Sequence, residues 1–183
     1  MDLADLHRPA DGALTAMSAT SLSRRALLFG RGPKPQQPSI RPPWARPASA
    51  FADACTRCGD CVAACPERVL SMDATGRPVF DPASGECSFC GACAESCASG
   101  ALSKQPSAPP WTWRAVVSER CLGRQGVVCF SCQDACPQQA IVRVPGRLGG
   151  LRVDAERCNG CGACVGVCPA AAVRFECAAE ASS

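Results

Sequence analysis

The pattern of apolar and polar residues along the chain predicts two short β-hairpins and several short helices. Apolar residues dominate 140–144 and 151–153, and Pro and Gly residues fill the segment between them, as in a strand–turn–strand unit. A weaker version of the pattern occupies 69–72 and 79–80, around a Thr-Gly pair. Ala and Val residues in and after the intervening cysteine-rich segments suit short helices. No apolar run approaches the roughly 18 residues of a membrane span, so we expect none.

The cysteines form an internal repeat that includes all but one of the 17 in the chain. Three groups of four follow the spacing C-x2-C-x2-C-x3-C, and the third group along the chain has seven residues in its first gap. The second group repeats the first at an offset of 32 residues, and the second half repeats the first at an offset of 71. The members are Cys55, Cys58, Cys61, Cys65, Cys87, Cys90, Cys93, Cys97, Cys121, Cys129, Cys132, Cys136, Cys158, Cys161, Cys164 and Cys168.

Polar and Pro-rich stretches divide the chain around this repeat. Residues 103–110 contain three prolines and predict a linker or turn between the halves. The net charge of +3 is too small to indicate nucleic-acid binding. It is uneven, because residues 1–50 hold seven Lys and Arg against three Asp and Glu. We expect a basic, Pro-rich, largely irregular N-terminal extension (1–50), a first half (51–104), a linker (105–118), a second half (119–177) and a C-terminal tail (178–183).

The cysteine spacing, followed by Pro in three of the four groups, is the ligand run of bacterial ferredoxins for a [4Fe–4S] cluster. Three thiolates lie on one tight loop, and the fourth ligates the other cluster of a two-cluster unit. Gly59, Gly91, Gly160 and Gly162 suit such loops, because backbone N–H groups must approach the inorganic sulfides. We expect four clusters, bound by Cys55, Cys58, Cys61 and Cys97; by Cys87, Cys90, Cys93 and Cys65; by Cys121, Cys129, Cys132 and Cys168; and by Cys158, Cys161, Cys164 and Cys136.

Two other uses of the cysteines fit the spacing less well. A structural zinc site favours two separated C-x2-C pairs, and a disulfide framework is typical of small secreted chains. Histidine chemistry is nearly excluded, since His7 is the only histidine. No Gly-rich nucleotide loop is present, and four cysteines at each cluster leave no iron open to substrate, so we expect no enzyme. Cys177 lies outside every group, and we expect an idle or buried thiol.

The N-terminal segment leaves two interpretations open. Residues 23–28, Ser-Arg-Arg-Ala-Leu-Leu, resemble a twin-arginine export motif, but no apolar h-region follows, which favours a cytoplasmic segment. Residues 22–29 form either a short helix that docks a partner or a disordered tail. We expect Trp44 to pack on the first half. Because aromatic residues make up only 5% of the chain, we expect bound clusters to help hold the fold.

Several of these features together resemble the NapF family, ferredoxin-type proteins of periplasmic nitrate reductase systems. The resemblance rests on the stretch at 23–28, Ile-Arg-Pro-Pro-Trp at 40–44, the order of the cysteine groups, the gap from Cys121 to Cys129, and Cys-Asn-Gly-Cys-Gly-Ala-Cys at 158–164. Ala98 departs from the Cys-Pro pattern, which concerns turn geometry more than cluster binding.

The cysteine pattern and the hairpins predict an α+β fold of two tandem bacterial-ferredoxin-like units, each with two clusters, small β-hairpins and short helices. The resemblance implies a cytoplasmic protein that binds the precursor of the catalytic molybdenum subunit of periplasmic nitrate reductase before its export. Its implied role is maturation of that subunit, by electron or cluster transfer. The cysteine pattern supports a general electron-transfer ferredoxin subunit for a separate oxidoreductase equally well.

Overall fold

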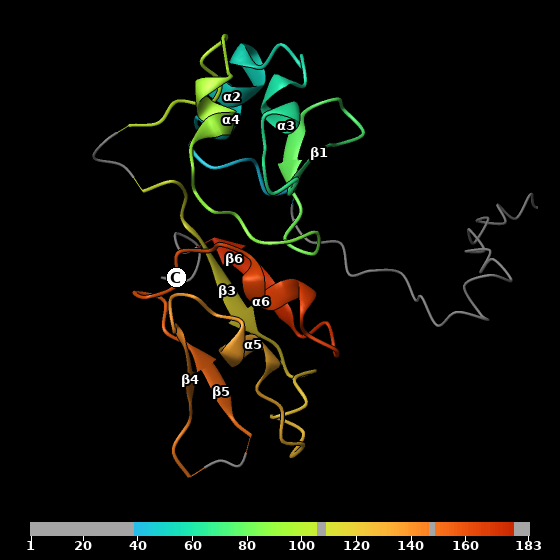
Figure 1. The fold of residues 1–183 in the computed structure, drawn as a ribbon, viewed down its shortest axis with the longest axis vertical. Coiled ribbons are helices and arrows are strands. Elements are labelled where there is room, and N and C mark those ends of the chain that lie inside the picture. Colours follow the sequence, from blue (N-terminus) through green and yellow to red (C-terminus); the bar gives the residue numbers. More distant parts are fainter. Residues whose placement is uncertain (1–38, 106–108, 147–148, 178–183) are drawn as a thin grey trace, which may run out of the picture. The chain divides into compact units, whose positions relative to one another are not determined.

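A computed structural model describes residues 39–105, 109–146 and 149–177 (Figure 1). These residues belong to one structural unit that runs from residue 37 onward. The export-like stretch at 23–28, the docking helix considered at 22–29 and the tail at 178–183 lie outside the described residues. No described helix has the length and hydropathy needed to span a lipid bilayer.

The first half of the described chain contains a β-hairpin and three short helices. The helices are α2 (Ala48–Ala54), α3 (Asp60–Ala63) and α4 (Ala92–Glu95), and the strands are β1 (Leu70–Met72) and β2 (Pro78–Phe80). The strands pair antiparallel with Leu70 opposite Phe80. Both of these residues are buried, whereas Ser71, the next residue along β1, is exposed, as expected when successive side chains of a strand point to opposite sides. The hairpin predicted from the weak apolar pattern is therefore confirmed.

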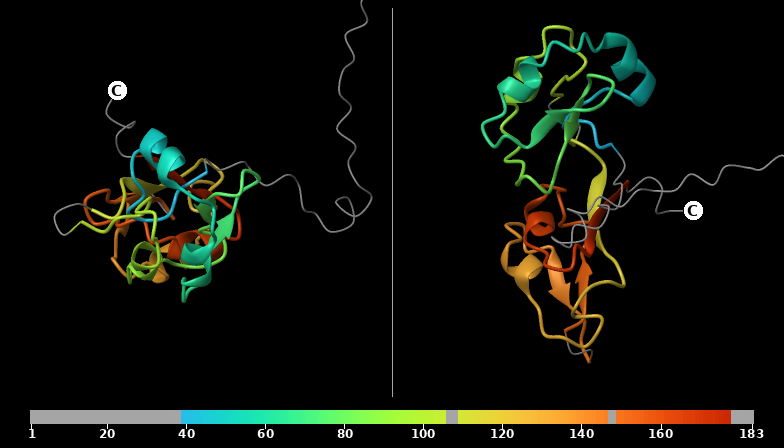
Figure 2. Two further views of the ribbon diagram at one scale, coloured as in Figure 1. Left: turned by 90° about the horizontal axis from the view of Figure 1, so that it is seen from above. Right: turned by 90° about the vertical axis from the view of Figure 1, so that its right-hand side faces the viewer.

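The second half contains two antiparallel strand pairs and two short helices. Its elements are β3 (Trp113–Val117), α5 (Ser131–Asp134), β4 (Ile141–Arg143), β5 (Leu151–Val153), α6 (Ala163–Gly166) and β6 (Val173–Cys177). The β4–β5 pair is the predicted hairpin, and the β3–β6 pair joins the two ends of this half. Strand β3 lies in the segment expected as a linker. Figure 1 and the right-hand view of Figure 2 show the elements of each half gathered together.

The internal duplication begins earlier in the chain than its cysteines suggest. An antiparallel bridge joins Ala45 to Leu102. The offset of 71 residues maps these two positions onto β3 and β6, within one residue of the β3–β6 register. Ile40 also bridges to Phe80 and is buried. Residues 39–50 are thus part of the first half, which differs from the expected irregular extension. The ladder is short here because residues 42 and 43 are prolines, which have no N–H to donate.

The few aromatic side chains concentrate where the two halves meet. The ring of Phe80 lies 4.9 Å from that of Trp111 and 6.2 Å from that of Phe175, measured between centroids. Phe89 lies 5.6 Å from Trp111, with the two rings edge to face. Trp44 packs edge to face on Phe89 at 6.5 Å, which confirms the prediction that Trp44 packs on the first half. We call the Phe80, Phe89, Trp111 and Phe175 cluster the aromatic seam.

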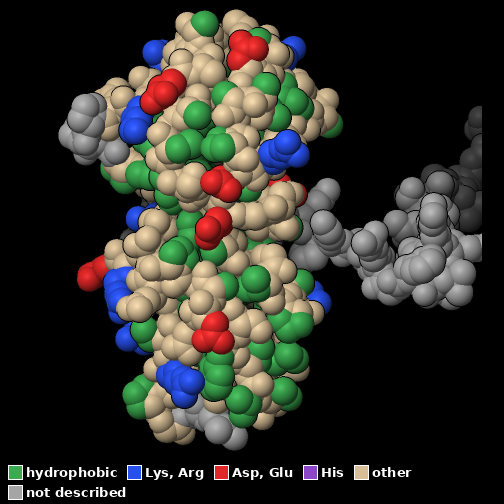
Figure 3. Space-filling view, in the orientation of Figure 1, with side chains coloured by type: hydrophobic (Ala, Val, Ile, Leu, Met, Phe, Trp, Pro, Cys, Tyr) green, Lys and Arg blue, Asp and Glu red, His purple; other side chains and the backbone are tan. Residues whose placement is uncertain are grey.

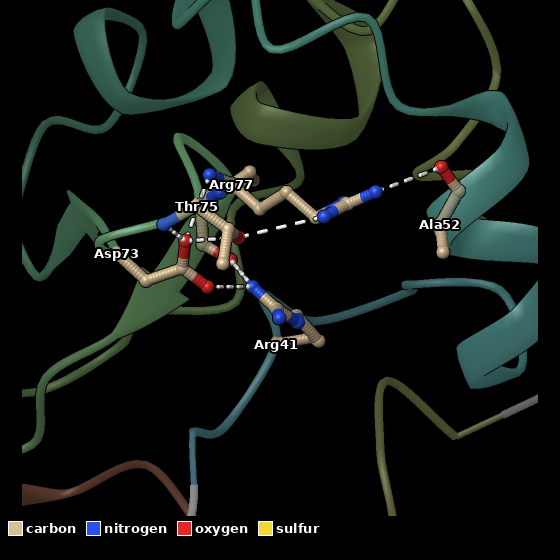
Figure 4. A network of polar contacts seen from close by, with 6 residues as sticks. Arg41, Ala52, Asp73, Thr75 and Arg77 are labelled. Atoms are coloured by element: carbon tan, nitrogen blue, oxygen red, sulfur yellow. Dashed lines mark hydrogen bonds and ion pairs between the residues drawn. The ribbon is translucent and has the colours of Figure 1, made fainter.

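A polar network links the turn of the β1–β2 hairpin to other parts of the first half (Figure 4). Asp73 accepts hydrogen bonds from the hydroxyl of Thr75 (2.6 Å) and the N–H of Arg77 (3.0 Å), and it pairs with Arg41 at 2.7 Å. The Thr75 hydroxyl, followed by the N–H of Arg77, holds the pKa of the Asp73 carboxyl well below its usual range. Arg77 also donates to the carbonyl of Ala52, so the network ties the hairpin turn to α2.

Charged side chains are dispersed over one face of the molecule. On the face shown in Figure 3, Lys and Arg side chains are interspersed with Asp and Glu, and apolar side chains lie between them. This face therefore presents charges of both signs rather than the single-sign field that steers a highly charged partner.

Candidate metal centres

Each cysteine group folds into a loop followed by a four-residue helix. The third cysteine lies inside the helix, as Cys61 does in α3 and Cys164 does in α6, and the fourth follows just beyond the helix end. In three groups the residues on both sides of the second cysteine have positive φ, which turns the loop back on itself. They are Arg57 and Gly59 (62° and 86°), Phe89 and Gly91 (53° and 94°), and Gly160 and Gly162 (78° and 100°). The glycines were predicted from the sequence, whereas Arg57 and Phe89 were not.

A further residue with positive φ lies three positions after the fourth cysteine of every group. The four residues are Arg68 (φ 54°), Gly100 (67°), Gln139 (48°) and Ala171 (46°). Ala98 replaces the proline of the other groups without loss of this turn, so the departure from the Cys-Pro pattern leaves the local geometry intact.

The turn directs backbone N–H groups at the fourth cysteine. The Sγ of Cys136 accepts the N–H of Ala140 at 3.3 Å, and the Sγ of Cys168 accepts that of Ala172 at 3.2 Å. The Sγ of Cys97 accepts the N–H of Leu102 at 3.4 Å. Such donors stabilise negative charge on sulfur.

Four cavities in the described part of the chain are each lined by four cysteines. The space not filled by protein atoms at each cavity is about 310 to 330 Å³, and part of it is open to solvent. In each one, three cysteines come from one group and the fourth comes from the other group of the same half. The sets are Cys55, Cys58, Cys61 and Cys97 (site 1), Cys65, Cys87, Cys90 and Cys93 (site 2), Cys121, Cys129, Cys132 and Cys168 (site 3), and Cys136, Cys158, Cys161 and Cys164 (site 4). The sequence pattern grouped the cysteines in the same way.

The irregular third group reaches its cavity by folding its longer gap back. The N–H of Gln125 donates to the carbonyl of Cys121, and the N–H of Val127 donates to that of Leu122. Gly123 packs so tightly on Gly149 that a Cβ would overlap the Gly149 carbonyl oxygen. The turn thus places the buried Cys121 in the same cavity lining as Cys129.

The donor set fits an iron–sulfur cluster better than the two alternatives. None of the cysteines is in a disulfide. Each cavity takes three of its four cysteines from one group, whereas a structural zinc site favours two separated C-x2-C pairs. Four thiols around one cavity, with backbone N–H groups that donate to sulfur, are the surroundings that a [4Fe–4S] cluster requires.

Burial disfavours the thiolate form of several cysteines in these sites. Burial, followed by the charge of neighbouring sulfurs, raises the pKa of Cys61 to about 11 and those of Cys93 and Cys164 to about 12. Burial acts in the same direction on Cys97, but the N–H of Leu102 and the hydroxyl of Ser99 favour its thiolate, and its pKa falls. A positively charged metal core would compensate this burial, and its binding releases protons.

Sites 2 and 4 meet where the two halves pack together. The N–H of Cys87 donates to the carbonyl of Cys161 at 2.7 Å, so ligand loops of two sites share a backbone hydrogen bond. The indole N–H of Trp111 donates to the carbonyl of Asn159 at 3.0 Å beside it. A Cβ on Gly162 would lie 2.9 Å from the ring of Phe80. The aromatic seam therefore packs against the loop of site 4 and holds it in place.

Cys177 stands apart from the four sites. It ends β6, and its Sγ lies 3.2 Å from the hydroxyl oxygen of Thr112. It contributes to none of the four cavity linings.

Comparison with known proteins identifies the same repeat. The chain matches the family described as 4Fe-4S dicluster domain over residues 54–101 and again over 125–172. It is 39% identical over 157 residues to Ferredoxin-type protein NapF of Escherichia coli (strain K12), covering 84% of this chain and 94% of that protein. Ferredoxin-type protein NapF of Haemophilus influenzae is 38% identical over 174 residues, covering 86% and 95%.

A relative with a different name has the same kind of similarity. Methylamine utilization ferredoxin-type protein MauM of Methylophilus methylotrophus is 32% identical over 170 residues, covering 82% of this chain and 75% of that protein. The two dicluster matches and the similarity to NapF over most of both chains agree with the cysteine geometry. The chain belongs to the NapF family of ferredoxin-type electron-transfer proteins, which bind [4Fe–4S] clusters.

Proposed function

We propose that the chain holds four [4Fe–4S] clusters, one in each of sites 1 to 4, and takes part in maturation of the catalytic molybdenum subunit of periplasmic nitrate reductase. The chain acts in the cytoplasm on the precursor of that subunit, before export, by electron or cluster transfer. The set of four cavities, each lined by four cysteines from both groups of one half, carries the cluster part of the proposal. The nitrate reductase part rests on the similarity to Ferredoxin-type protein NapF.

The residues of the chain suit a carrier of electrons. Bound [4Fe–4S] clusters take up and release single electrons. The side chains of Cys58 and Cys90 are exposed, so sites 1 and 2 each present a ligand at the protein surface where a partner can approach. The remaining ligands are buried or half-buried, which shields the sites from water.

Anaerobic purification tests the cofactor proposal directly. About sixteen irons and sixteen acid-labile sulfides per chain are expected from four clusters. Colourless protein, or protein that retains only zinc, would contradict the proposal. The partner is tested separately, by incubating the tagged holoprotein with the purified precursor of the catalytic subunit. Binding of the precursor but not of the exported mature subunit supports maturation, and binding of neither contradicts it.

A general electron-transfer subunit is the second candidate function. The backbone hydrogen bond between Cys87 and Cys161 favours it, because it brings sites of the two halves together as conduction through the whole protein requires. The similarity to a ferredoxin-type protein of methylamine utilization also fits this candidate. Removal of the protein after the partner enzyme has matured separates the two functions. Loss of electron flow at that stage supports the carrier, and unchanged flow supports maturation.

A further inference from the structure

Two serine hydroxyls lie against sulfurs of the cysteine sites. The Oγ of Ser99 is 3.6 Å from the Sγ of Cys97 in site 1. The Oγ of Ser131 is 3.7 Å from the Sγ of Cys129 in site 3. Among the described residues, no other serine or threonine hydroxyl is hydrogen-bonded to a sulfur that lines one of the four cavities.

These contacts are specific to two of the four cysteine groups. In the repeat, the position of Ser99 is taken by Glu67, Gln138 and Ala170, and the position of Ser131 is taken by Asp60, Ala92 and Ala163. The Ser99 oxygen also accepts the N–H of Ala101 at 3.5 Å, which holds it in place. The two serines therefore distinguish sites 1 and 3 from sites 2 and 4, which meet at the Cys87–Cys161 contact.

The hydroxyl must be the donor when a site is loaded. A thiolate that ligates iron carries no proton, so it can only accept. A hydrogen bond donated to a ligand sulfur stabilises negative charge, and the reduced state of a site carries one more negative charge than its oxidised state. Hydrogen bonds to the sulfurs are among the factors that set the reduction potential of such sites.

We propose that the hydroxyls of Ser99 and Ser131 raise the reduction potentials of sites 1 and 3 by donating hydrogen bonds to Cys97 and Cys129. This inference rests on the proposed function, because it requires clusters at these sites. It goes further, because it gives sites 1 and 3 a preference for the electron. Sites 2 and 4, which meet at the Cys87–Cys161 contact, receive no such preference from a side chain.

The test is a redox titration of the full-length holoprotein with dithionite as the reductant, followed by EPR. In Ser99→Ala we expect the signal of one cluster to shift to a more negative potential while the others stay in place. In Ser131→Ala a different cluster shifts in the same direction, and the double variant shifts both. Ser99→Thr keeps a hydroxyl at this position, so we expect site 1 to have the same reduction potential in this variant as in the unmodified protein.

Ser96→Ala is the matched control. Ser96 lies just before Cys97, and its hydroxyl donates to the carbonyl of Cys93 at 3.2 Å rather than to a sulfur. We expect all four potentials to be unchanged in this variant. Iron and sulfide are counted in every preparation, so a missing cluster is recognised as failure of the proposed function. If Ser99→Ala and Ser131→Ala keep full iron and titrate as the unmodified protein does, the tuning role is overturned.

Discussion

Three glycines at the same position of the repeat give a direct measure of how tightly the halves pack. Gly59, Gly91 and Gly162 each follow the second cysteine of their group, with φ of 86°, 94° and 100°. Substitution of any of them by alanine forces a side chain into a left-handed conformation, which costs about 1–2 kcal/mol. This cost is shared by the three variants and cancels in their comparison.

The surroundings of the three positions differ sharply. A Cβ on Gly59 meets nothing within 4 Å, and on Gly91 it meets the flexible end of the Lys104 side chain. On Gly162 it meets the ring of Phe80 at 2.9 Å and the carbonyl oxygen of Gly85 at 3.1 Å, which belong to the other half. Overpacking of this kind costs about 1–3 kcal/mol, because rigid neighbours must move. We expect Gly162→Ala to be less stable than Gly59→Ala by this amount.

The assay follows the loss of visible absorbance from the anaerobic holoprotein in guanidinium chloride. Because cluster loss is irreversible, the rate reports kinetic stability. The strain at Gly162 is relieved when the halves separate, so Gly162→Ala should bleach about 5–150-fold faster than Gly59→Ala, the range that 1–3 kcal/mol represents. Gly91→Ala should resemble Gly59→Ala. Equal rates for Gly59→Ala and Gly162→Ala would show that the halves do not pack as described.

Three further predictions concern the ligands, the seam and the polar network. Cys58→Ser should lose about four of the sixteen irons per chain, whereas Cys177→Ser should lose none, as measured by iron analysis. Trp111→Phe, which leaves the Asn159 carbonyl without its donor, should bleach about fivefold faster than the unmodified protein, which corresponds to about 1 kcal/mol; an unchanged rate would contradict this role. Asp73→Asn should bleach about 5–150-fold faster at neutral pH, which corresponds to a cost of about 1–3 kcal/mol. Because folding depresses the pKa of Asp73, its stabilisation is fully present above about pH 4. The ratio of the two bleaching rates should therefore stay constant across the neutral range, in which the acid-labile clusters persist, and a ratio that changes with pH there would contradict this role of Asp73.

Local signals in the sequence predicted the local parts of the fold. The β4–β5 hairpin was predictable because Pro and Gly separate two apolar segments that are close in the chain. The β3–β6 pair was not, since its strands lie about sixty residues apart and β3 follows a Pro-rich stretch typical of a linker. Helix α2 was also missed, because a Pro-rich stretch directly precedes it and Phe51 is its only buried residue.

The spacing predicted the first three cysteines of each set and the two-cluster ferredoxin pattern predicted the fourth, and the four cavity linings have the same composition. The details that shape each site were not accessible in this way. The positive φ of Arg57 and Phe89 is imposed by loop closure rather than by residue type, and glycine alone signals such angles in a sequence. The contacts of Ser99 and Ser131 depend on side-chain rotamers, which no sequence pattern records.

The exchange of one cysteine between the two groups of each half determines when each site becomes complete during translation. Site 2 gains its last cysteine at Cys93 and site 1 at Cys97, so neither is complete when only the first group has been translated. The second half repeats this at Cys164 and Cys168. At about 5–20 residues per second, the two sites of a half are completed within about a second of each other. Cofactor insertion can therefore begin in either half only once both of its cysteine groups have been translated, and the N-terminal half is ready first.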